Sequence, residues 1–315
     1  MDVSQQLKQN FPLKDATTLS IGGPAKSFIS VKTEPNLKDA IKYTKENSLN
    51  FLVIGSGSNL LVSDEGFDGL IIKNEITGIE QYEDTLTVKS GTILQELVDY
   101  ANKNSLEGLQ KMTGIPGTVG GAIYGNAGAY GQTISDYIKE VKIYDSGRNE
   151  FASMTKDQCI FDYRDSIFKK NHHIILEVKF ELSKADSDNL KQESEEVLSK
   201  RLVKYPPGIK CPGSFFKNIV ADTLPQEILE KIPQEKIVYG KIPAGSLLED
   251  VGAKGKTLGD IEIATYHANL FINKGSGKAS DFYNLAKTYY QKVKEKFGIN
   301  LEPEVQLINL PPLFS

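Results

Sequence analysis

The stretch GIPGTVGGAIYGNAGAYG occupies residues 114–131 and places seven glycines in 18 positions. Glycine loses more conformational freedom on folding than any other residue, so this density is costly. In return, the backbone can approach a ligand closely and its N–H groups can point at anions. The alternative is a tight turn or a barrel corner, which is the less favoured reading for so long a run. The stretch therefore predicts a loop that binds an anionic ligand.

A second glycine loop lies upstream in VIGSGSNLLVSD, residues 53–64, directly after a short apolar run. A strand that feeds a Gly/Ser turn is a natural cradle for pyrophosphate. The Rossmann pattern GxGxxG would need glycine where the chain has Leu60, and no helix is expected to start there. Two glycine loops in one domain therefore indicate a dinucleotide bound outside the Rossmann scheme.

Hydrophobic periodicity predicts alternating strands and helices in the first half and a long helix near the end. We expect Ser280 to cap that last helix and Gly298 to end it. The polar stretch 183–188 indicates a domain boundary, which gives domains at 1–185 and 186–300 and a C-terminal strand segment at 301–315. The expected strands are 25–32, 51–54, 70–73, 86–89, 138–144, 174–182 and 304–308, and the expected helices are 35–47, 93–104, 190–203 and 280–297.

Composition narrows the functional class. The 315 residues carry a formal net charge of −4, so the basic footprint of a nucleic-acid-binding protein is absent. No apolar run approaches the roughly 20 residues that span a bilayer, and the first residues do not form a secretory signal. Two distant cysteines and three histidines are too few for a disulfide framework or a zinc site. We expect a cytoplasmic enzyme without a metal, and no protein partner can be inferred.

Eight segments resemble the UDP-N-acetylenolpyruvoylglucosamine reductase family, within the vanillyl-alcohol-oxidase (VAO or PCMH) type FAD-binding superfamily. The resemblance implies an α+β fold, in which a PCMH/VAO-type FAD-binding domain of two α/β parts precedes a separate C-terminal α+β substrate-binding domain. The segments follow the family's order and span nearly the whole chain: SIGGPA (20–25), VIGSGSNLLV (53–62), GIPGTVGGAIYGNAGAYG (114–131), YRDSIFK (163–169), GSFFKN (213–218), PAGSLLEDVGAKG (243–255), HANLFINKGSGKASD (267–281) and LEPEV (301–305).

The resemblance implies an NADPH-dependent reduction of UDP-N-acetylglucosamine enolpyruvate to UDP-N-acetylmuramate, in peptidoglycan precursor synthesis and hence cell wall biogenesis, cell shape and cell division. FAD would be bound non-covalently, which agrees with the lack of His and Cys in both glycine loops. The UDP-sugar and NADPH would be the partners of the chain. By resemblance, the FAD contacts would be Ile54, Gly55, Ser56, Gly57, Ser58, Asn59, Leu60, Gly114, Ile115, Pro116, Gly117, Thr118, Gly120, Gly121, Ala122, Asn126, Gly128 and Ala129.

The reduction of an enol ether needs a hydride at the terminal vinyl carbon, stabilisation of the negative charge that develops beside the carboxylate, and a proton for that carbon. Arg164 matches the family residue that stabilises the negative charge, because a guanidinium can hold a carboxylate in two places. Ser214 matches the proton donor. Glu304 matches the catalytic glutamate, which in protonated form could hydrogen-bond the enolate. Without the motifs, each residue would have a commoner role: a surface ion pair for an arginine, a loop hydroxyl bonded to nearby backbone for a serine, and a carboxylate on a strand surface for a glutamate.

Tyr163, Lys217 and Asn218 are expected to face the substrate, and Lys217 could also assist Ser214. The chain departs from the family at Ser246, where a bulky aromatic residue is usual, and at Gln306, where arginine is common. Two alternatives stay open on the residues alone. One is an oxidase or dehydrogenase for a small alcohol or lactone on the same FAD scaffold, which would need a base in place of a proton donor. The other is a nucleotide-binding protein without activity.

Overall fold

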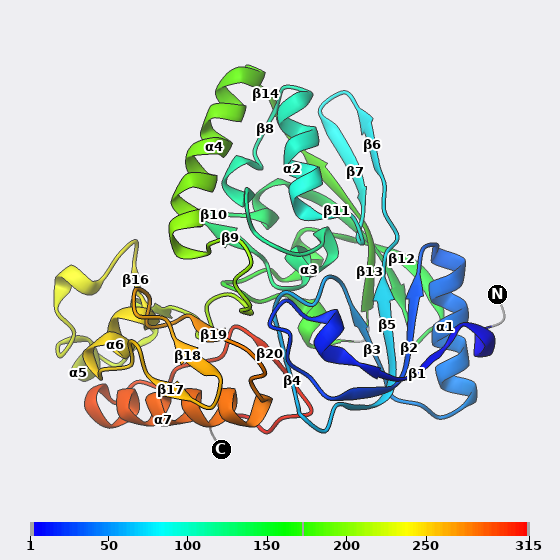
Figure 1. The fold of residues 1–315 in the computed structure, drawn as a ribbon. Coiled ribbons are helices and arrows are strands. Elements are labelled where there is room, and N and C mark those ends of the chain that lie inside the picture. Colours follow the sequence, from blue (N-terminus) through cyan, green and yellow to red (C-terminus); the bar gives the residue numbers. More distant parts are fainter. Residues whose placement is uncertain (1–2, 172, 314–315) are drawn as a thin grey trace. The chain divides into compact units, whose positions relative to one another are not determined.

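The computed structural model describes residues 3–171 and 173–313, and these form two compact units (Figure 1). Unit 1 contains residues 3–10, 26–56 and, apart from 172, 68–206, while unit 2 contains residues 11–25, 57–67 and 207–313. Helices and strands are mixed in both units, which confirms the expected α+β class. The compact units differ from the domains expected at 1–185 and 186–300, because two N-terminal segments belong to unit 2 and residues 186–206 belong to unit 1.

The first sheet of unit 1 has four strands in the order β1 (Lys8–Pro12), β2 (Pro24–Val31), β5 (Phe67–Asn74) and β3 (Phe51–Ile54). Strands β3 and β5 are parallel. Helix α1 (Glu34–Glu46) starts after Thr33, whose hydroxyl accepts a hydrogen bond from the Asn36 N–H at 3.3 Å. Leu37 and Ile41 on one face of α1 pack into the same core as Ile72 of β5. The amphipathic spacing of α1 therefore serves to cover this sheet.

The second sheet of unit 1 is antiparallel. The helices that pack with it include α3 (Val119–Tyr124), which lies within the long glycine stretch, and α2 (Leu94–Lys103) and α4 (Ser187–Lys204), which contact the first residue of that stretch. Leu97, Val119, Ile123 and Val178 belong to its core, which is distinct from the core under α1. The two larger sheets of unit 1 therefore each have their own helices, as expected for the FAD-binding part. The strand order is β12 (Glu150–Thr155), β11 (Ile138–Asp145), β13 (His173–Glu181), β7 (Thr85–Lys89) and β6 (Ile79–Tyr82).

Buried hydrogen bonds explain why α4 packs with unit 1 rather than with the C-terminal unit. The Asn102 amide of α2 donates to the Ser194 hydroxyl of α4 at 2.8 Å, and the Gln110 amide donates to Asn102 Oδ1 at 2.7 Å. All three side chains are buried. Because buried polar groups need partners, separation of α4 from α2 would deprive the Asn102 amide of its bond to Ser194. Figure 1 shows α4 running alongside α2.

Unit 2 is built on helix α7 (Ala279–Phe297) and an aromatic core. The rings of Phe215, Phe271 and Phe282 lie with centroids 5.1–5.4 Å apart. Leu19 and Leu61 from the two N-terminal segments are buried in this same core, which explains why these segments belong to unit 2. Its strands and helices are β4 (Leu60–Val62) parallel to β20 (Gln306–Ile308), β15 (Ile219–Val220) with β16 (Lys241–Ile242), β17 (Thr257–Leu258), β18 (Ile261–Ile263) and β19 (Phe271–Asn273) in one sheet, α5 (Gln226–Leu229) and α6 (Ala244–Asp250).

Short elements complete the described part of the chain. The remaining strands are β9 (Gly128–Ala129) with β10 (Gln132–Thr133), and β8 (Leu106–Glu107) with β14 (Ser183–Lys184). The 3₁₀ helices are η1 (Ser4–Gln6), η2 (Leu13–Ala16), η3 (Gln110–Met112), η4 (Ile134–Tyr137), η5 (Asp157–Cys159), η6 (Ile167–Lys169), η7 (Ala221–Thr223) and η8 (Gln234–Lys236).

Two expectations about helix and strand ends were wrong. Ser280 does not cap α7, which begins at Ala279; instead, the Asp64 carboxylate accepts the N–H groups of Ala279 and Ser280 at 2.7 and 2.9 Å. A distant side chain thus replaces the local cap. Glu304 does not lie in the last strand, because β20 begins only at Gln306. Gly298 ends α7 in the left-handed conformation with φ +74°, as expected.

Candidate active site

The long glycine stretch contains a helix that its composition did not predict. Helix α3 occupies its centre, and the Thr118 hydroxyl caps it by accepting the Gly121 N–H at 3.2 Å. Gly120 is required for packing: its N–H donates to Ser90 O at 2.8 Å, and a Cβ at this position would lie 2.9 Å from Ser90 Cβ. Part of the glycine content therefore allows α3 to lie against the end of β7.

Other glycines of the stretch present an open backbone. A Cβ on Gly121 would be no closer than 3.5 Å to its nearest neighbour, Thr118 Oγ1, and Gly121 is exposed. A Cβ on Gly131 would have no neighbour within 4 Å. Nearby, the Asn126 Oδ1 atom is buried without a hydrogen-bond partner. An orphaned acceptor beside open backbone fits a polar ligand lying along this stretch.

Residues of the second glycine loop, 53–64, divide between the two units. In unit 1, a Cβ on Gly55 would lie 2.4 Å from Thr118 Oγ1, so residues expected from both loops meet there. In unit 2, the Asn59 side chain donates to Glu304 O at 3.0 Å, and Asn59 O accepts the Gln306 N–H at 2.9 Å. The loop thus contacts the other glycine stretch through Gly55 and the Glu304 segment through Asn59.

Arg164 lies at the end of the glycine stretch in unit 1. Its guanidinium donates to the carbonyl oxygens of Asn126, at 3.3 Å, and Gly128. Its backbone has φ +53°, an uncommon value for a residue with a side chain, and such strain is frequent at functional sites. The Tyr163 ring centroid lies 5.4 Å from the Arg164 Cζ atom. The structure therefore brings together four of the residues expected at the site, namely Arg164, Tyr163, Asn126 and Gly128.

Ser214 and Glu304 lie on neighbouring segments of unit 2. Ser214 forms a β-bridge with Leu270, and the next residue, Phe215, accepts the Glu304 N–H at 2.7 Å through its carbonyl oxygen. Both Ser214 and Glu304 are half-buried. Gly213, with φ +88°, allows the turn that leads into Ser214. The expected proton donor and the expected glutamate are therefore positioned by one backbone arrangement.

Asn269 is a positioning residue that the sequence did not reveal. Its Oδ1 accepts the Phe216 N–H at 2.9 Å, and its Nδ2 donates to Phe216 O at 2.8 Å. Its own carbonyl accepts the Phe215 N–H at 3.0 Å, and only 2% of the residue is exposed. These three bonds fix the segment after Ser214. A polar residue between the apolar Ala268 and Leu270 is the only signal that the sequence offers.

The other expected substrate residues in unit 2 have partners within the unit. Lys217 Nζ lies 2.6 Å from Glu302 Oε1, and Asn218 Oδ1 accepts the N–H of Ala244 at the start of α6 at 3.2 Å. Of the two family departures, the Ser246 hydroxyl donates to Pro243 O at 2.8 Å, and the Gln306 amide donates to Glu304 O at 3.4 Å. The proposed contacts of Lys217 and Asn218 with the substrate stay predictions.

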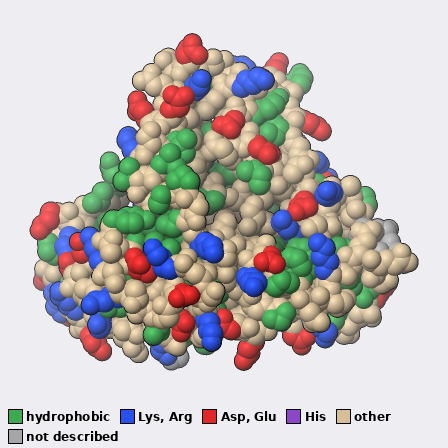
Figure 2. Space-filling model, viewed as in Figure 1, with side chains coloured by type: hydrophobic (Ala, Val, Ile, Leu, Met, Phe, Trp, Pro, Cys, Tyr) green, Lys and Arg blue, Asp and Glu red, His purple; other side chains and the backbone are tan. Residues whose placement is uncertain are grey.

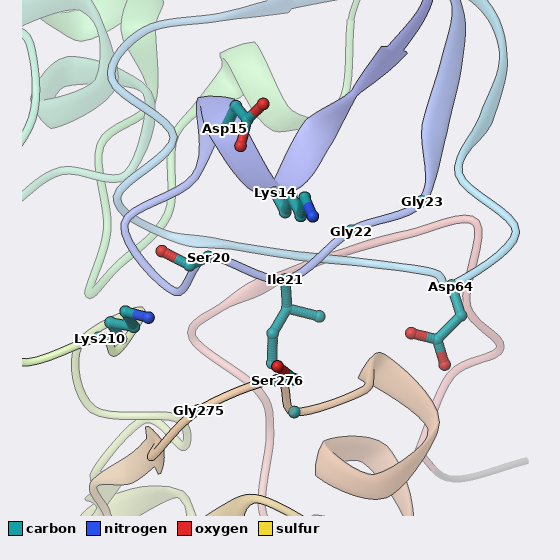
Figure 3. Close-up of a pocket in the computed structure, with 11 residues that line it drawn as sticks. Lys14, Asp15, Ser20, Ile21, Gly22, Gly23, Asp64, Lys210, Gly275 and Ser276 are labelled. Atoms are coloured by element: carbon teal, nitrogen blue, oxygen red, sulfur yellow. The ribbon is translucent and has the colours of Figure 1, made fainter.

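A cavity of about 470 Å³ in unit 2 contains none of the expected site residues (Figure 3). It is formed by η2, the SIGGPA motif and the glycines after β19, with Lys14 and Lys210 among its lining residues. Asp64 in its wall already caps α7. The other charged residues that line the cavity, Lys14, Asp15 and Lys210, are exposed, so we assign no catalytic group to it.

Four further features concern surface charge, metal ligands, membrane helices and cysteine reactivity in the described part of the chain. Positive and negative side chains are interspersed over the face shown in Figure 2. Within residues 3–171 and 173–313, no three His, Cys, Asp or Glu side chains gather as metal ligands would. No described helix is both long and apolar enough to cross a membrane. Burial raises the pKa of the Cys159 thiol to about 11, so this cysteine is a poor nucleophile.

Comparison with known proteins gives a consistent result. A family model described as "FAD binding domain" matches residues 25–149, and one described as "UDP-N-acetylenolpyruvoylglucosamine reductase, C-terminal domain" matches residues 206–308. Reductases with that name from Solibacter usitatus and Clostridium botulinum are 39% and 36% identical over 298 residues. The matches cover 94% of this chain in both cases, and 95% and 90% of the respective relatives.

A solved structure agrees with these relatives. The crystal structure of UDP-N-acetylenolpyruvylglucosamine reductase from Thermus caldophilus matches with a TM-score of 0.74 at 30% identity. The match covers 96% of this chain and 98% of that structure. The likeness therefore extends over both units.

Proposed function

Because the chain belongs to the UDP-N-acetylenolpyruvoylglucosamine reductase family, we propose that Arg164, Ser214 and Glu304 carry out the reaction of that family. The chain is an FAD-dependent oxidoreductase that reduces the enolpyruvyl group of UDP-N-acetylglucosamine enolpyruvate in peptidoglycan synthesis. The assignment of the three residues and of NADPH as the electron donor is the proposal. Family membership sets aside the oxidase and the inactive nucleotide-binding protein.

The residues of unit 1 fit a non-covalently bound FAD. The open backbone at Gly121 and Gly131 and the unsatisfied Asn126 Oδ1 atom would accommodate a dinucleotide along the glycine stretch. Neither glycine loop contains a His or Cys that could attach a flavin covalently. When bound, FAD supplies the hydride that reaches the vinyl carbon, and NADPH replenishes it. The residues proposed to contact it are those expected from the two loops, from Ile54 to Leu60 and from Gly114 to Ala129.

Arg164 is proposed to bind the carboxylate of the enolpyruvyl group. Its guanidinium is anchored by the Asn126 and Gly128 carbonyl oxygens, which fix its plane. A guanidinium has five N–H donors, so donors remain for a carboxylate. As hydride transfer places negative charge beside that carboxylate, a fixed cation stabilises the developing enolate more than it stabilises the substrate.

Ser214 is proposed to deliver a proton to the carbon beside the carboxylate. A serine hydroxyl is a weak acid, so it can act only toward a strongly basic carbon in a precise position. The proposal is supported by the hydrogen bonds that the Asn269 side chain and the Glu304 N–H make to the two residues after Ser214, because they restrict the backbone there. Glu304, in its protonated form, is proposed to donate a hydrogen bond to the enolate oxygen.

The observation that carries this proposal is the bond from the Glu304 N–H to Phe215 O at 2.7 Å. It holds the proposed proton donor and the proposed enolate-binding acid on adjacent segments. An oxidase on a flavin scaffold would need a proton-accepting base in place of the proton donor.

The test is Ser214→Ala, which removes the hydroxyl without a change in charge. Reduction of the bound flavin by NADPH should proceed at nearly the normal rate. Reoxidation by the enolpyruvyl sugar should slow by at least about 10²-fold, the usual effect of losing a positioned proton donor. Ser214→Cys should recover part of the rate, because a thiol is more acidic than an alcohol.

Stopped-flow absorbance of the flavin separates the two half-reactions. The matched control is Thr288→Ala, which removes an exposed hydroxyl of the same unit that donates to Asn284 O of its own helix, α7, at 2.9 Å. It should leave both half-reactions unchanged. Slower reduction by NADPH with normal reoxidation in Ser214→Ala would show that Ser214 positions the nicotinamide or the flavin, and the assignment as proton donor would be wrong.

A further inference from the structure

Arginine is scarce in this chain, and its distribution is uneven. The sequence contains only Arg148, Arg164 and Arg201. The side chain of Arg148 is 78% exposed and lies 3.8 Å from Asp145 Oδ2 and 3.7 Å from Glu150 Oε1. Arg164 and Arg201 are partly buried and belong to unit 1. Arg148 thus has acidic neighbours at the surface, a role that lysine could also fill. Arg164 and Arg201 lie in less exposed places, where the shape of the guanidinium matters more.

Arg201 packs against the first residue of the glycine stretch. It lies in the last turn of α4, and a Cβ on Gly114 would lie 3.2 Å from both its Cδ and Nε atoms. Gly114 has φ +73°, so glycine is favoured there for its conformation as well as for space. Arg201 therefore lies at the beginning of the stretch, while Arg164 is bonded to the carbonyl of Gly128 near its end.

The charge of Arg201 has no anionic partner among the described residues. Its Nε atom is buried and makes no hydrogen bond, and no carboxylate forms an ion pair with it within residues 3–171 and 173–313. The Tyr205 ring, 5.3 Å from its Cζ atom, is a weak substitute. Burial lowers the pKa of the Arg201 guanidinium, the charge of Arg164 lowers it further, and Tyr205 and Tyr130 raise it.

Arg201 is only partly exposed and its buried Nε atom has no hydrogen-bond partner, so nothing among the described residues offsets the cost of taking part of this guanidinium out of water. A guanidinium stays protonated at any ordinary pH, so loss of its proton cannot relieve the cost. Arg164 increases the cost, because it is a second cation close enough to perturb Arg201. An anion bound beside the glycine stretch would remove the cost, and a diphosphate has the charge and the oxygen spacing that guanidinium forks bind.

We propose that Arg201 binds the diphosphate group of a nucleotide ligand, at the start of the glycine stretch. This inference rests on the proposed function, which provides two such ligands, FAD and the UDP-sugar. Both carry a diphosphate, so the chemistry recognised by Arg201 is the same, and direct binding measurements distinguish the two sources.

The test compares Arg201→Met, which keeps the length of the side chain and removes its charge, with the control Arg148→Met. The flavin-stripped full-length chain is titrated with FAD and with riboflavin, which lacks the diphosphate, and the FAD-loaded chain is titrated with UDP and with uridine. Arg201→Met should weaken binding of FAD or of UDP by about 10- to 100-fold, as expected for a charge-assisted hydrogen bond. Binding of riboflavin and uridine, and all binding by Arg148→Met, should stay unchanged.

A second measurement separates this role from a structural one. Without any nucleotide, Arg201→Met should unfold at a temperature no lower than that of the wild type, because it removes an unpaired charge. A loss specific to FAD identifies the flavin as the source of the diphosphate, and a loss specific to UDP identifies the sugar nucleotide. Wild-type affinity for both ligands in Arg201→Met would overturn the proposal. If the wild type itself bound neither FAD nor UDP, the proposed function would fail with it.

Discussion

Adjacent glycines in α3 allow a direct test of the idea that the glycine stretch presents backbone to FAD. A Cβ on Gly120 would lie 2.9 Å from Ser90 Cβ and 3.0 Å from Ser90 O, whereas a Cβ on Gly121 would meet nothing closer than 3.5 Å. Ser90 cannot easily move, because its hydroxyl accepts a hydrogen bond from the buried Asn74 amide at 2.8 Å. Valine should therefore affect mainly the stability of the protein at position 120 and mainly FAD binding at position 121.

The expected magnitudes follow from these contacts. Gly120→Val should destabilise the flavin-free protein by about 1–3 kcal/mol, the usual cost of overpacking. Gly121→Val should change its stability by less than about 0.5 kcal/mol, since the position is exposed and valine is a slightly better helix former than glycine. In contrast, Gly121→Val should weaken FAD binding by at least tenfold, or about 1.4 kcal/mol, because the side chain occupies the space of the ligand.

Thermal unfolding of the flavin-stripped chain measures the first effect, and titration with FAD by fluorescence quenching measures the second. The reasoning would be refuted if Gly121→Val bound FAD as tightly as the wild type. It would also be refuted if Gly120→Val were as stable as the wild type, since the packing argument for that glycine would then be wrong.

Three further predictions concern single side chains. Arg164→Lys should lower turnover by more than about tenfold, because lysine keeps the charge but lacks the planar fork that holds a carboxylate in a fixed, two-point geometry; near-normal turnover would return Arg164 to an ordinary structural role. Asn269→Ala should lower the free energy of unfolding by about 2–4 kcal/mol, because both backbone groups of Phe216 lose their partners, and urea unfolding measures this. Burial raises the pKa of Glu34, but its hydrogen bonds to Lys142 and Lys89 outweigh burial and hold the pKa below its ordinary value of 4.5. Glu34→Gln should therefore cost about 1–3 kcal/mol at neutral pH, and the difference from the wild type should shrink as the pH falls below 4.5 through the lowered pKa; a difference that did not depend on pH would contradict the ion-pair account.

Local patterns predicted most of the secondary structure. The α1, α2, α4 and α7 helices and the strands β2, β3, β5, β7, β11 and β13 lie where apolar spacing and caps place them. The helix at α4 begins three residues earlier than expected, because the Asp186 carboxylate accepts the Asn189 N–H and caps it. The glycine density of residues 114–131 also predicted the open backbone found at Gly121 and Gly131, although it did not predict helix α3.

Features that depend on contacts distant in sequence could not be predicted. Asp64 caps α7 from 215 residues away, and Leu19 and Leu61 join the core of unit 2 although they precede most of unit 1 in the chain. Asn269 and Arg201 acquire their importance only from what surrounds them in three dimensions. No local spacing encodes these neighbours, because residue periodicity reports which side of an element is buried and not what buries it.

The most direct test of the central claim follows the visible absorbance of the purified protein in the absence of oxygen. Addition of NADPH should bleach the yellow flavin, and addition of UDP-N-acetylglucosamine enolpyruvate should restore the colour with formation of one UDP-N-acetylmuramate for each flavin reoxidised. A flavin that NADPH bleaches but that the enolpyruvyl sugar leaves reduced would contradict the assignment of this chain as the reductase.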